Sequence, residues 1–256
     1  MKKLFIVFIL LLTLSISAEE IKLKDEGALL SVLYHQAASE YTALCYQAYN
    51  LATDRLLAID AADYDKPLAV VLDVDETVLS NSRYNARNVL GIAEMKGGFN
   101  GWLDEMASEP IAGAYEFLQL ADSLGIKIFY VTNRNERKQP ETIGNLQKYD
   151  YPQVNKAQVL CKTKVSSKEP RRQMIAQNYE IVMLIGDNLI DFADIYGGRT
   201  LDERDMAVAV SRADFGRKFI ILPNAMHGNW LKVINDFEYD LSEEELLQKR
   251  LRYLKY

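Results

Sequence analysis

The sequence has little of what several functional classes require. Its 256 residues include two cysteines and two histidines, with no Cys/His cluster of the kind that binds zinc, so no zinc site is expected. The formal net charge of −6 argues against binding to a nucleic-acid polymer. There is no internal repeat or low-complexity tract, and no apolar run after the first 17 residues is long enough to cross a membrane.

The few cysteines and histidines leave specific expectations. Cys45 and Cys161 both lie among apolar neighbours. An oxidising compartment permits a disulfide between them, and two buried thiols are at least as good an expectation. His35 lies beside an apolar helical stripe, so we expect a structural histidine there rather than a catalyst.

The amino-terminal segment predicts export. Two lysines precede an apolar stretch at residues 4–14, and Ser15-Ile16-Ser17 forms a small-x-small cleavage site. We expect residues 1–17 to be a signal peptide, with cleavage one residue later as the alternative. Residues 18–256 would then form one exported domain, in the periplasm or secreted. No cysteine stands at the cleavage point, so no lipid anchor is expected to hold the mature chain on a membrane.

The chain is organised around residues 68–79. An apolar, partly β-branched run follows Pro67 and ends at Asp73, which is typical of a strand buried on both faces of a parallel sheet. Asp73 and Asp75 are two positions apart, so we expect them side by side at the carboxyl edge of the sheet, where open α/β sheets bind ligands. The alternative is a pair of solvated aspartates that cap a helix starting near Glu76.

Strands and helices alternate along the rest of the chain. Four more strands are expected at residues 126–134, 158–161, 181–185 and 219–223. Helices are expected at residues 111–124, 136–149, 169–178 and 204–209, with a last helix from residue 242. Short connections between them predict an α/β fold with a parallel sheet covered on both faces. One helix is expected over residues 26–62, and residues 80–110 lack clear periodicity; both are expected to form a smaller, mainly helical cap over the pocket.

Polar groups follow three of the expected strands and would meet at one edge. They are Asp73 and Asp75, then Thr132 and Asn133, then Asp187, Asn188 and Asp191. A basic loop at residues 162–168 returns to the same edge. Carboxylates this crowded are costly unless a cation balances them, and their oxygens suit Mg²⁺. A carboxylate nucleophile, a second carboxylate for proton transfer, and a hydroxyl and a lysine for phosphate oxygens fit phosphoryl transfer.

Two strings of residues resemble a known family. Asp73-Val74-Asp75-Glu76-Thr77-Val78 is similar to the first motif of the haloacid dehalogenase (HAD) superfamily. The longer strings at 71–84 and 182–192 resemble the two-part signature of bacterial class C acid phosphatases. Within that group the chain most resembles the lipoprotein e(P4)-type 5′-nucleotidases, including at 34–41 and 223–230, and the similarity covers roughly residues 28–235.

The resemblance implies a HAD-like (Rossmannoid) core and a Mg²⁺-dependent acid phosphatase or 5′-nucleotidase. Its substrates would be small phosphomonoesters such as nucleoside monophosphates, and it would assemble as a homodimer. Asp73 would be the nucleophile that forms an aspartyl-phosphate, and Asp75 the acid/base that gives its backbone carbonyl to Mg²⁺. Asp187 would bind the metal directly, and Asp191 would hold metal-bound water.

The resemblance also implies ligands for the rest of the substrate. The phosphate ligands would be Thr132, Asn133 and Lys168, with Lys168 preferred to Lys162 and Lys164 because it immediately precedes the helix that holds Pro170. An aromatic cage would hold a nucleoside base, where stacking contributes ~1–3 kcal/mol. The candidates for that cage, each of which ordinary packing explains equally well, are Tyr84, Phe99, Trp102, His227 and Trp230. His227 stands where the family has Tyr, which leaves base preference and pH dependence open.

Two other functions stay open at this point. A binding or storage protein could keep the phosphatase scaffold without turnover, although binding alone needs no nucleophile. A phosphotransferase could use the same site with an alcohol acceptor. Dehalogenation is disfavoured because it does not need Asp75 to protonate an alkoxide.

Overall fold

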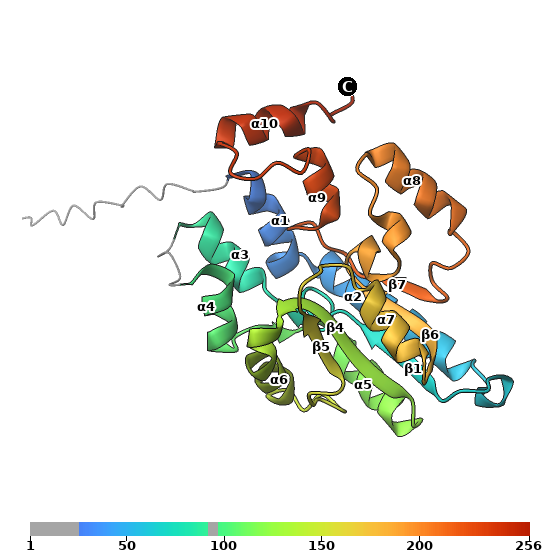
Figure 1. The fold of residues 1–256 in the computed structure, drawn as a ribbon. Helices are drawn as coiled ribbons and strands as arrows, with labels where there is room; N and C mark the ends of the chain where they lie inside the picture. Colours follow the sequence, from blue (N-terminus) through green and yellow to red (C-terminus); the bar gives the residue numbers. More distant parts are fainter. Residues whose placement is uncertain (1–25, 92–96) are drawn as a thin grey trace, which may run out of the picture.

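The computed structural model describes residues 26–91 and 97–256 (Figure 1), so the predicted signal peptide at residues 1–17 lies outside the described residues. Within them, a parallel sheet has the strand order β5-β4-β1-β6-β7. Its strands are β1 Leu68–Leu72, β4 Lys127–Asn135, β5 Val159–Lys162, β6 Glu180–Gly186 and β7 Phe219–Ile221. Because β1 pairs with β4 on one side and β6 on the other, the strand that leads into Asp73 is central.

Helices cover both faces of the sheet, which confirms the predicted α/β class. Val70 and Leu72 of β1 enter one apolar cluster, whereas Ala69 and Val71 enter the other. One face is covered by α2 Ser39–Leu57, α5 Ala114–Ser123 and α6 Gln139–Gln147. The opposite face is covered by α7 Glu169–Ala176 and α8 Leu201–Val210. All of β1 is buried, which explains why its sequence is apolar without alternation.

Two amino-terminal segments differ from the sequence-based expectation. The helix expected over residues 26–62 is two helices, α1 Glu26–Ala37 and α2, because Ala38 between them is extended (φ −83°, ψ 120°). The segment over residues 80–110 contains two short helices, α3 Ser82–Val89 and α4 Gly98–Glu105. Each has only eight residues, too few turns to show an apolar period. They lie between β2 Leu79–Ser80 and β3 Glu109–Pro110, which pair antiparallel.

The remaining elements are short. They are η1 Ala61–Asp63, η2 Glu136–Lys138, η3 Leu189–Asp191, η4 Asp194–Tyr196, α9 Asn229–Ile234 and α10 Glu243–Leu251. Figure 1 shows α3 and α4 side by side, with α1 next to α3. Val32 of α1 and Val89 of α3 form an apolar cluster with Met226, which precedes α9. The cap expected from residues 26–62 and 80–110 stays a prediction, and α2 packs on the main core.

The structure bears on the two cysteines and on membrane-spanning helices. Cys45 and Cys161 are both buried and free, so of the two alternatives the structure has two thiols and no disulfide. Among the described helices, none combines the length and the apolar character that a membrane span requires.

Candidate active site

Lys168 links two aspartates at the centre of the site. Asp73 follows β1, Asp191 ends η3 after β6, and Lys168 immediately precedes α7. The Lys168 ammonium contacts the Asp73 carboxylate and lies 2.7 Å from Oδ1 of Asp191. The lysine side chain is only 4% exposed. Its burial would lower the pKa of Lys168, but the charges of Asp191 and Asp73 outweigh this and raise it, so the ammonium is a fixed positive charge.

A cluster of carboxylates next to Lys168 fits a divalent cation. Oxygens of Asp73, Asp187 and Asp191 lie within 4.8 Å of one another. The ammonium balances one of these three charges, which leaves two for a cation, and an all-oxygen set suits Mg²⁺. Burial and the neighbouring aspartates raise the pKa of Asp73 against the opposing charge of Lys168, and they raise that of Asp187 to about 7. A bound cation would relieve this repulsion.

The turn after β6 fixes the positions of Asp187 and Asp191. Gly186 ends the strand, and a side chain there would collide with Asp191. The backbone N–H of Asn188 donates to Oδ2 of Asp191 at 3.0 Å. Asp187 accepts a hydrogen bond from the Thr77 hydroxyl at 3.2 Å and one from Nδ2 of Asn224 at 2.8 Å. Both aspartates are therefore oriented before any ligand binds.

Arg134, which the sequence analysis did not single out, holds Asp75. Its Nη2 and Nε lie 2.8 and 3.0 Å from Oδ1 of Asp75, and the arginine side chain is 1% exposed. Nδ2 of Asn81 donates to the same oxygen at 2.8 Å. Burial would raise the pKa of Asp75, but the charge and hydrogen bonds of Arg134 and the bond from Asn81 lower it. The structure therefore favours the ionised carboxylate.

The predicted phosphate ligands lie near these carboxylates in different settings. Lys168 contacts Asp73, and Asn133 lines the same cavity. Oδ1 of Asn133 accepts from Nη2 of Arg171 at 2.7 Å, which leaves its amide N–H groups for a ligand. Thr132 is fully buried and its hydroxyl donates to Asp75 at 3.3 Å, so its role as a phosphate ligand stays a prediction.

Glu76 and His227 form an ion pair at the edge of the site. Glu76 is fully buried and has a positive φ of 55°. Its Oε1 accepts from the backbone N–H of Asn81 at 2.6 Å, and its Oε2 lies 2.8 Å from Nε2 of His227. Partial burial would lower the pKa of His227, but Glu76 raises it to about 9. His227 is therefore an imidazolium at neutral pH.

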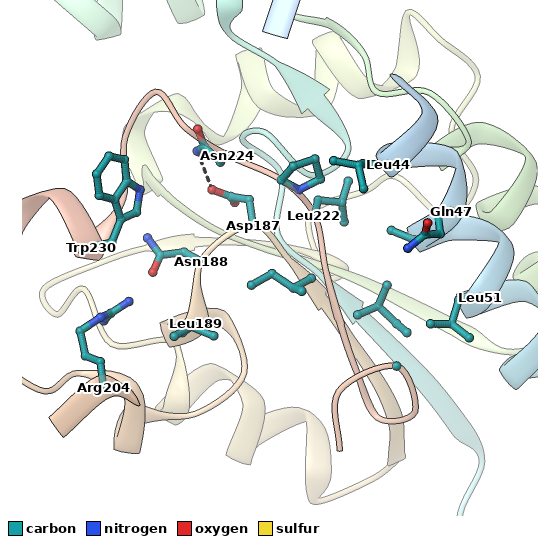
Figure 2. Close-up of a pocket in the computed structure, with 15 residues that line it drawn as sticks. Leu44, Gln47, Leu51, Asp187, Asn188, Leu189, Arg204, Leu222, Asn224 and Trp230 are labelled. Atoms are coloured by element: carbon teal, nitrogen blue, oxygen red, sulfur yellow. Dashed lines mark hydrogen bonds between the residues drawn. The ribbon is translucent and has the colours of Figure 1, made fainter. Parts of the chain in front are cut away.

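A cavity of about 680 Å³ opens onto these groups. Three of the five predicted aromatic ligands line it, namely Tyr84, Phe99 and His227, and the rings of Tyr84 and Phe99 meet edge to face at 5.2 Å. Trp102 does not line it. Its ring is buried, and its Nε1 donates to Oδ1 of Asn81 at 2.9 Å. Trp230 lines a neighbouring cavity (Figure 2).

The parallel sheet thus brings Asp73, Lys168, Asp187 and Asp191 together at its carboxyl edge. Residues 18–230 match the model of the HAD superfamily, subfamily IIIB (acid phosphatase). The chain belongs to this family, and the family predicted from its motifs is confirmed.

Solved structures and curated proteins agree with this assignment. The class C acid phosphatase from Bacillus anthracis is 36% identical, with a TM-score of 0.85 over 90% of this chain and 97% of that one. The structure of that enzyme with tungstate bound is 35% identical, with a TM-score of 0.84 and the same coverage. Acid phosphatase 1 of Solanum lycopersicum is 27% identical over 158 residues, 56% of this chain and 62% of the relative. The stem 31 kDa glycoprotein of Glycine max is 25% identical over 209 residues, 78% of this chain and 68% of the relative.

The chain thus spans about two thirds of the length of these curated relatives. Family membership and the structural likeness together indicate a phosphomonoesterase.

Proposed function

We propose that this chain is an exported, Mg²⁺-dependent acid phosphatase that hydrolyses small phosphomonoesters through an aspartyl-phosphate on Asp73. The observation that carries the proposal is the cluster of Asp73, Asp187 and Asp191 within 4.8 Å, beside the Lys168 ammonium. These carboxylates, with the backbone carbonyl of Asp75, would hold the metal. When bound, Mg²⁺ would supply positive charge that draws the phosphate oxygens to Asp73.

In the first step, a carboxylate oxygen of Asp73 attacks phosphorus and the bond to the ester oxygen breaks. The leaving oxygen takes its electron pair and receives a proton from Asp75. Lys168, the amide of Asn133 and the hydroxyl of Thr132 hold the other phosphate oxygens in this proposal.

In the second step, a water molecule attacks the phosphoryl group on Asp73 and gives its proton to Asp75. The bond between phosphorus and the Asp73 oxygen then breaks, which releases inorganic phosphate. Asp75 must be ionised for this step, and the contact with Arg134 supports that state.

The cavity supports a nucleoside monophosphate as the substrate class. Tyr84 and Phe99 line the same cavity as the carboxylates and offer rings for a base, and base stacking contributes ~1–3 kcal/mol. Periplasmic or secreted location and homodimer formation also belong to this proposal; they are supported by the sequence features and the family resemblance described above.

The direct test is release of inorganic phosphate from p-nitrophenyl phosphate and from AMP in the presence of Mg²⁺. We expect Asp73→Asn to lower kcat at least about a thousandfold, since it removes the nucleophile. The variant should still fold and unfold cooperatively, which circular dichroism checks. Asp202→Asn, at an exposed position on α8, is the control and should keep full activity.

The same assay separates the competing functions. A wild-type protein that binds AMP without releasing phosphate would be a binding or storage protein, and the proposal would be wrong. An ester of an added alcohol in place of free phosphate would indicate a phosphotransferase. If the Asp73→Asn variant kept more than roughly a few per cent of wild-type turnover, Asp73 would be excluded as the nucleophile.

A further inference from the structure

A second cavity, of about 590 Å³, adjoins the catalytic cavity. The two share Asp187 and Asn188, which belong to the turn after β6. The second cavity lies between α2, the chain after β7 and the start of α8 (Figure 2). Its size is within the usual range for small-molecule sites, and no step of the proposed reaction uses it.

One end of this second cavity is aliphatic. Figure 2 shows Leu44 and Leu51 of α2 at the end opposite Arg204 and Trp230. The apolar wall is formed by Leu44, Leu51, Leu189, Ile220, Ile221 and Leu222. Ile220 and Leu222 are buried at 2% exposure each, whereas Leu44 is 39% exposed at the rim. This wall favours an alkyl chain over a polar ligand.

The other end holds a buried cation. Arg204 is 6% exposed, and its Nη1 donates to the backbone carbonyl of Tyr196 at 2.7 Å. Within the described part of the chain this is the one hydrogen bond of its guanidinium, which forms no ion pair there. The charge of Asp205, the next residue on α8 and exposed, also acts on it. Figure 2 shows the guanidinium extending from α8 toward Leu189. A buried guanidinium with N–H groups to spare is stabilised by an anion.

The one acidic side chain in the described lining of this cavity is Asp187. It forms no ion pair with Arg204 and is oriented instead by hydrogen bonds from Thr77 and Asn224. From this arrangement we propose that the second cavity binds a small amphiphile, whose carboxylate pairs with Arg204 and whose alkyl chain runs toward Leu44 and Leu51. A medium-chain fatty acid has this chemistry. The proposal goes beyond the phosphatase reaction and does not depend on it.

The wall between the two cavities is closely packed at Gly228, which lines the catalytic cavity. Gly228 has a φ of 142°, and a Cβ there would lie 3.0 Å from both Nδ2 of Asn188 and Cδ1 of Trp230. A ligand in the second cavity would therefore touch this wall without entering the catalytic cavity. This separation predicts that inorganic phosphate does not compete with the amphiphile.

The test is calorimetric titration of the full chain in Mg²⁺ with decanoate, octanoate and decan-1-ol. We expect saturable binding of decanoate. Octanoate, two methylenes shorter, should bind roughly tenfold more weakly. Decan-1-ol, which lacks the charge, should bind at least about tenfold more weakly. Saturating inorganic phosphate should leave the Kd of decanoate unchanged.

Variants locate the binding. Leu44→Glu puts a charge into the alkyl end and should weaken decanoate binding at least about tenfold. Leu57→Glu is the matched control, because it lies on the same helix at 58% exposure and outside the cavity; its Kd should equal that of the wild type. Arg204→Gln should remove the preference for decanoate over decan-1-ol. If Arg204→Gln fails to fold, the comparison of Leu44→Glu with Leu57→Glu still shows whether decanoate binds in the second cavity.

Three results would overturn the proposal. They are no saturable binding of decanoate by the wild type, equal binding by Leu44→Glu, and displacement of decanoate by inorganic phosphate. The last would place the ligand in the catalytic cavity.

Discussion

The carboxylate of Asp75 is the most tightly held group of the site. It accepts hydrogen bonds from Arg134, Asn81 and Thr132. Because these bonds favour the ionised form, they keep Asp75 in the state that the second step needs but make it a weaker base, and they lower the fraction of protonated Asp75 that can donate in the first step. At the scale of single residues, Arg134 therefore sets the balance between the two proposed steps.

Replacing Arg134 should change the pH dependence of turnover. The pKa of Asp75 is held low by Arg134 against the effect of burial, so Arg134→Gln should raise that pKa. We expect the pH profile of kcat/KM to move upward by about one unit or more. Arg134→Lys keeps the positive charge and should shift the pH profile of kcat/KM less. Superimposable profiles for all three proteins would contradict this role.

The residues of the site differ in how far sequence could predict them. Asp73, Asp187 and Asp191 were predictable because the ends of parallel strands share an edge. Arg134 carried a usable signal, since it stands two positions after Thr132 and points the same way on a strand. The contact between Glu76 and His227 spans 151 positions, and no local pattern indicates it.

At the scale of elements, α1 is tied to the loop before α9 through one histidine. Nε2 of His35 accepts a hydrogen bond from the backbone N–H of Ala225 at 3.1 Å. Burial lowers the pKa of His35 from its ordinary value of 6.5 to about 4. The neutral ring is required for this contact, which agrees with the structural role expected from the sequence.

The His35 contact predicts loss of stability in acid. Between pH ~6.5 and ~4 the unfolded chain binds a proton at His35 that the folded chain does not, so stability falls as the pH falls through that window, by about 3 kcal/mol in total. His35→Gln can still accept from Ala225 and does not titrate. We expect the free energy of unfolding in urea to fall less for this variant than for the wild type between pH 7 and pH 4.5 (roughly the ends of the window). An equal loss in both proteins would exclude His35 as the cause.

The helices α3 and α4 carry the proposed base contact. Removing the ring in Phe99→Ala should raise KM for AMP roughly tenfold, with little effect on glycerol phosphate, which has no base to stack. Tyr239→Ala removes an aromatic ring from an exposed position and serves as the control. The proposal of an aromatic base site would be wrong if KM rose equally for both substrates.

Short elements are also where sequence-based prediction was weakest. The sheet and its covering helices were predicted because long apolar runs are unambiguous. Helices α3, α4 and α9 were missed, since each has too few turns for a period to emerge. Trp102 shows a related difficulty. Sequence alone does not distinguish a buried aromatic residue that donates a hydrogen bond to Asn81 from one that contacts a ligand.

At the scale of the whole molecule, the catalytic edge is built at the expense of stability. Three carboxylates, one buried and two half-buried, share one lysine and leave uncompensated charge at this edge of the sheet. A cation that binds only the folded chain would offset this, so stability and activity should depend on the same ion.

Chelation should therefore destabilise the protein as well as silence it. At a Mg²⁺ concentration 100 times its Kd, the gain is about 2.7 kcal/mol. EDTA should remove this gain along with turnover, and Mg²⁺ should restore both. Since the pKa of Asp187 without metal is raised to about 7, apparent Mg²⁺ affinity should weaken below that pH.

Urea unfolding with and without EDTA measures the stability that Mg²⁺ contributes. The Asp187→Asn variant should give the same unfolding curve in both conditions. Identical curves for the wild type would contradict the metal site.

The most direct test of the account is to trap the phosphorylated enzyme. The protein is mixed with p-nitrophenyl phosphate and Mg²⁺, quenched in acid during turnover, digested and analysed by mass spectrometry. We predict one added phosphoryl group on the peptide that contains Asp73, labile to hydroxylamine and absent in Asp73→Asn. A phosphoryl group on any other residue during full turnover would contradict the central role of Asp73.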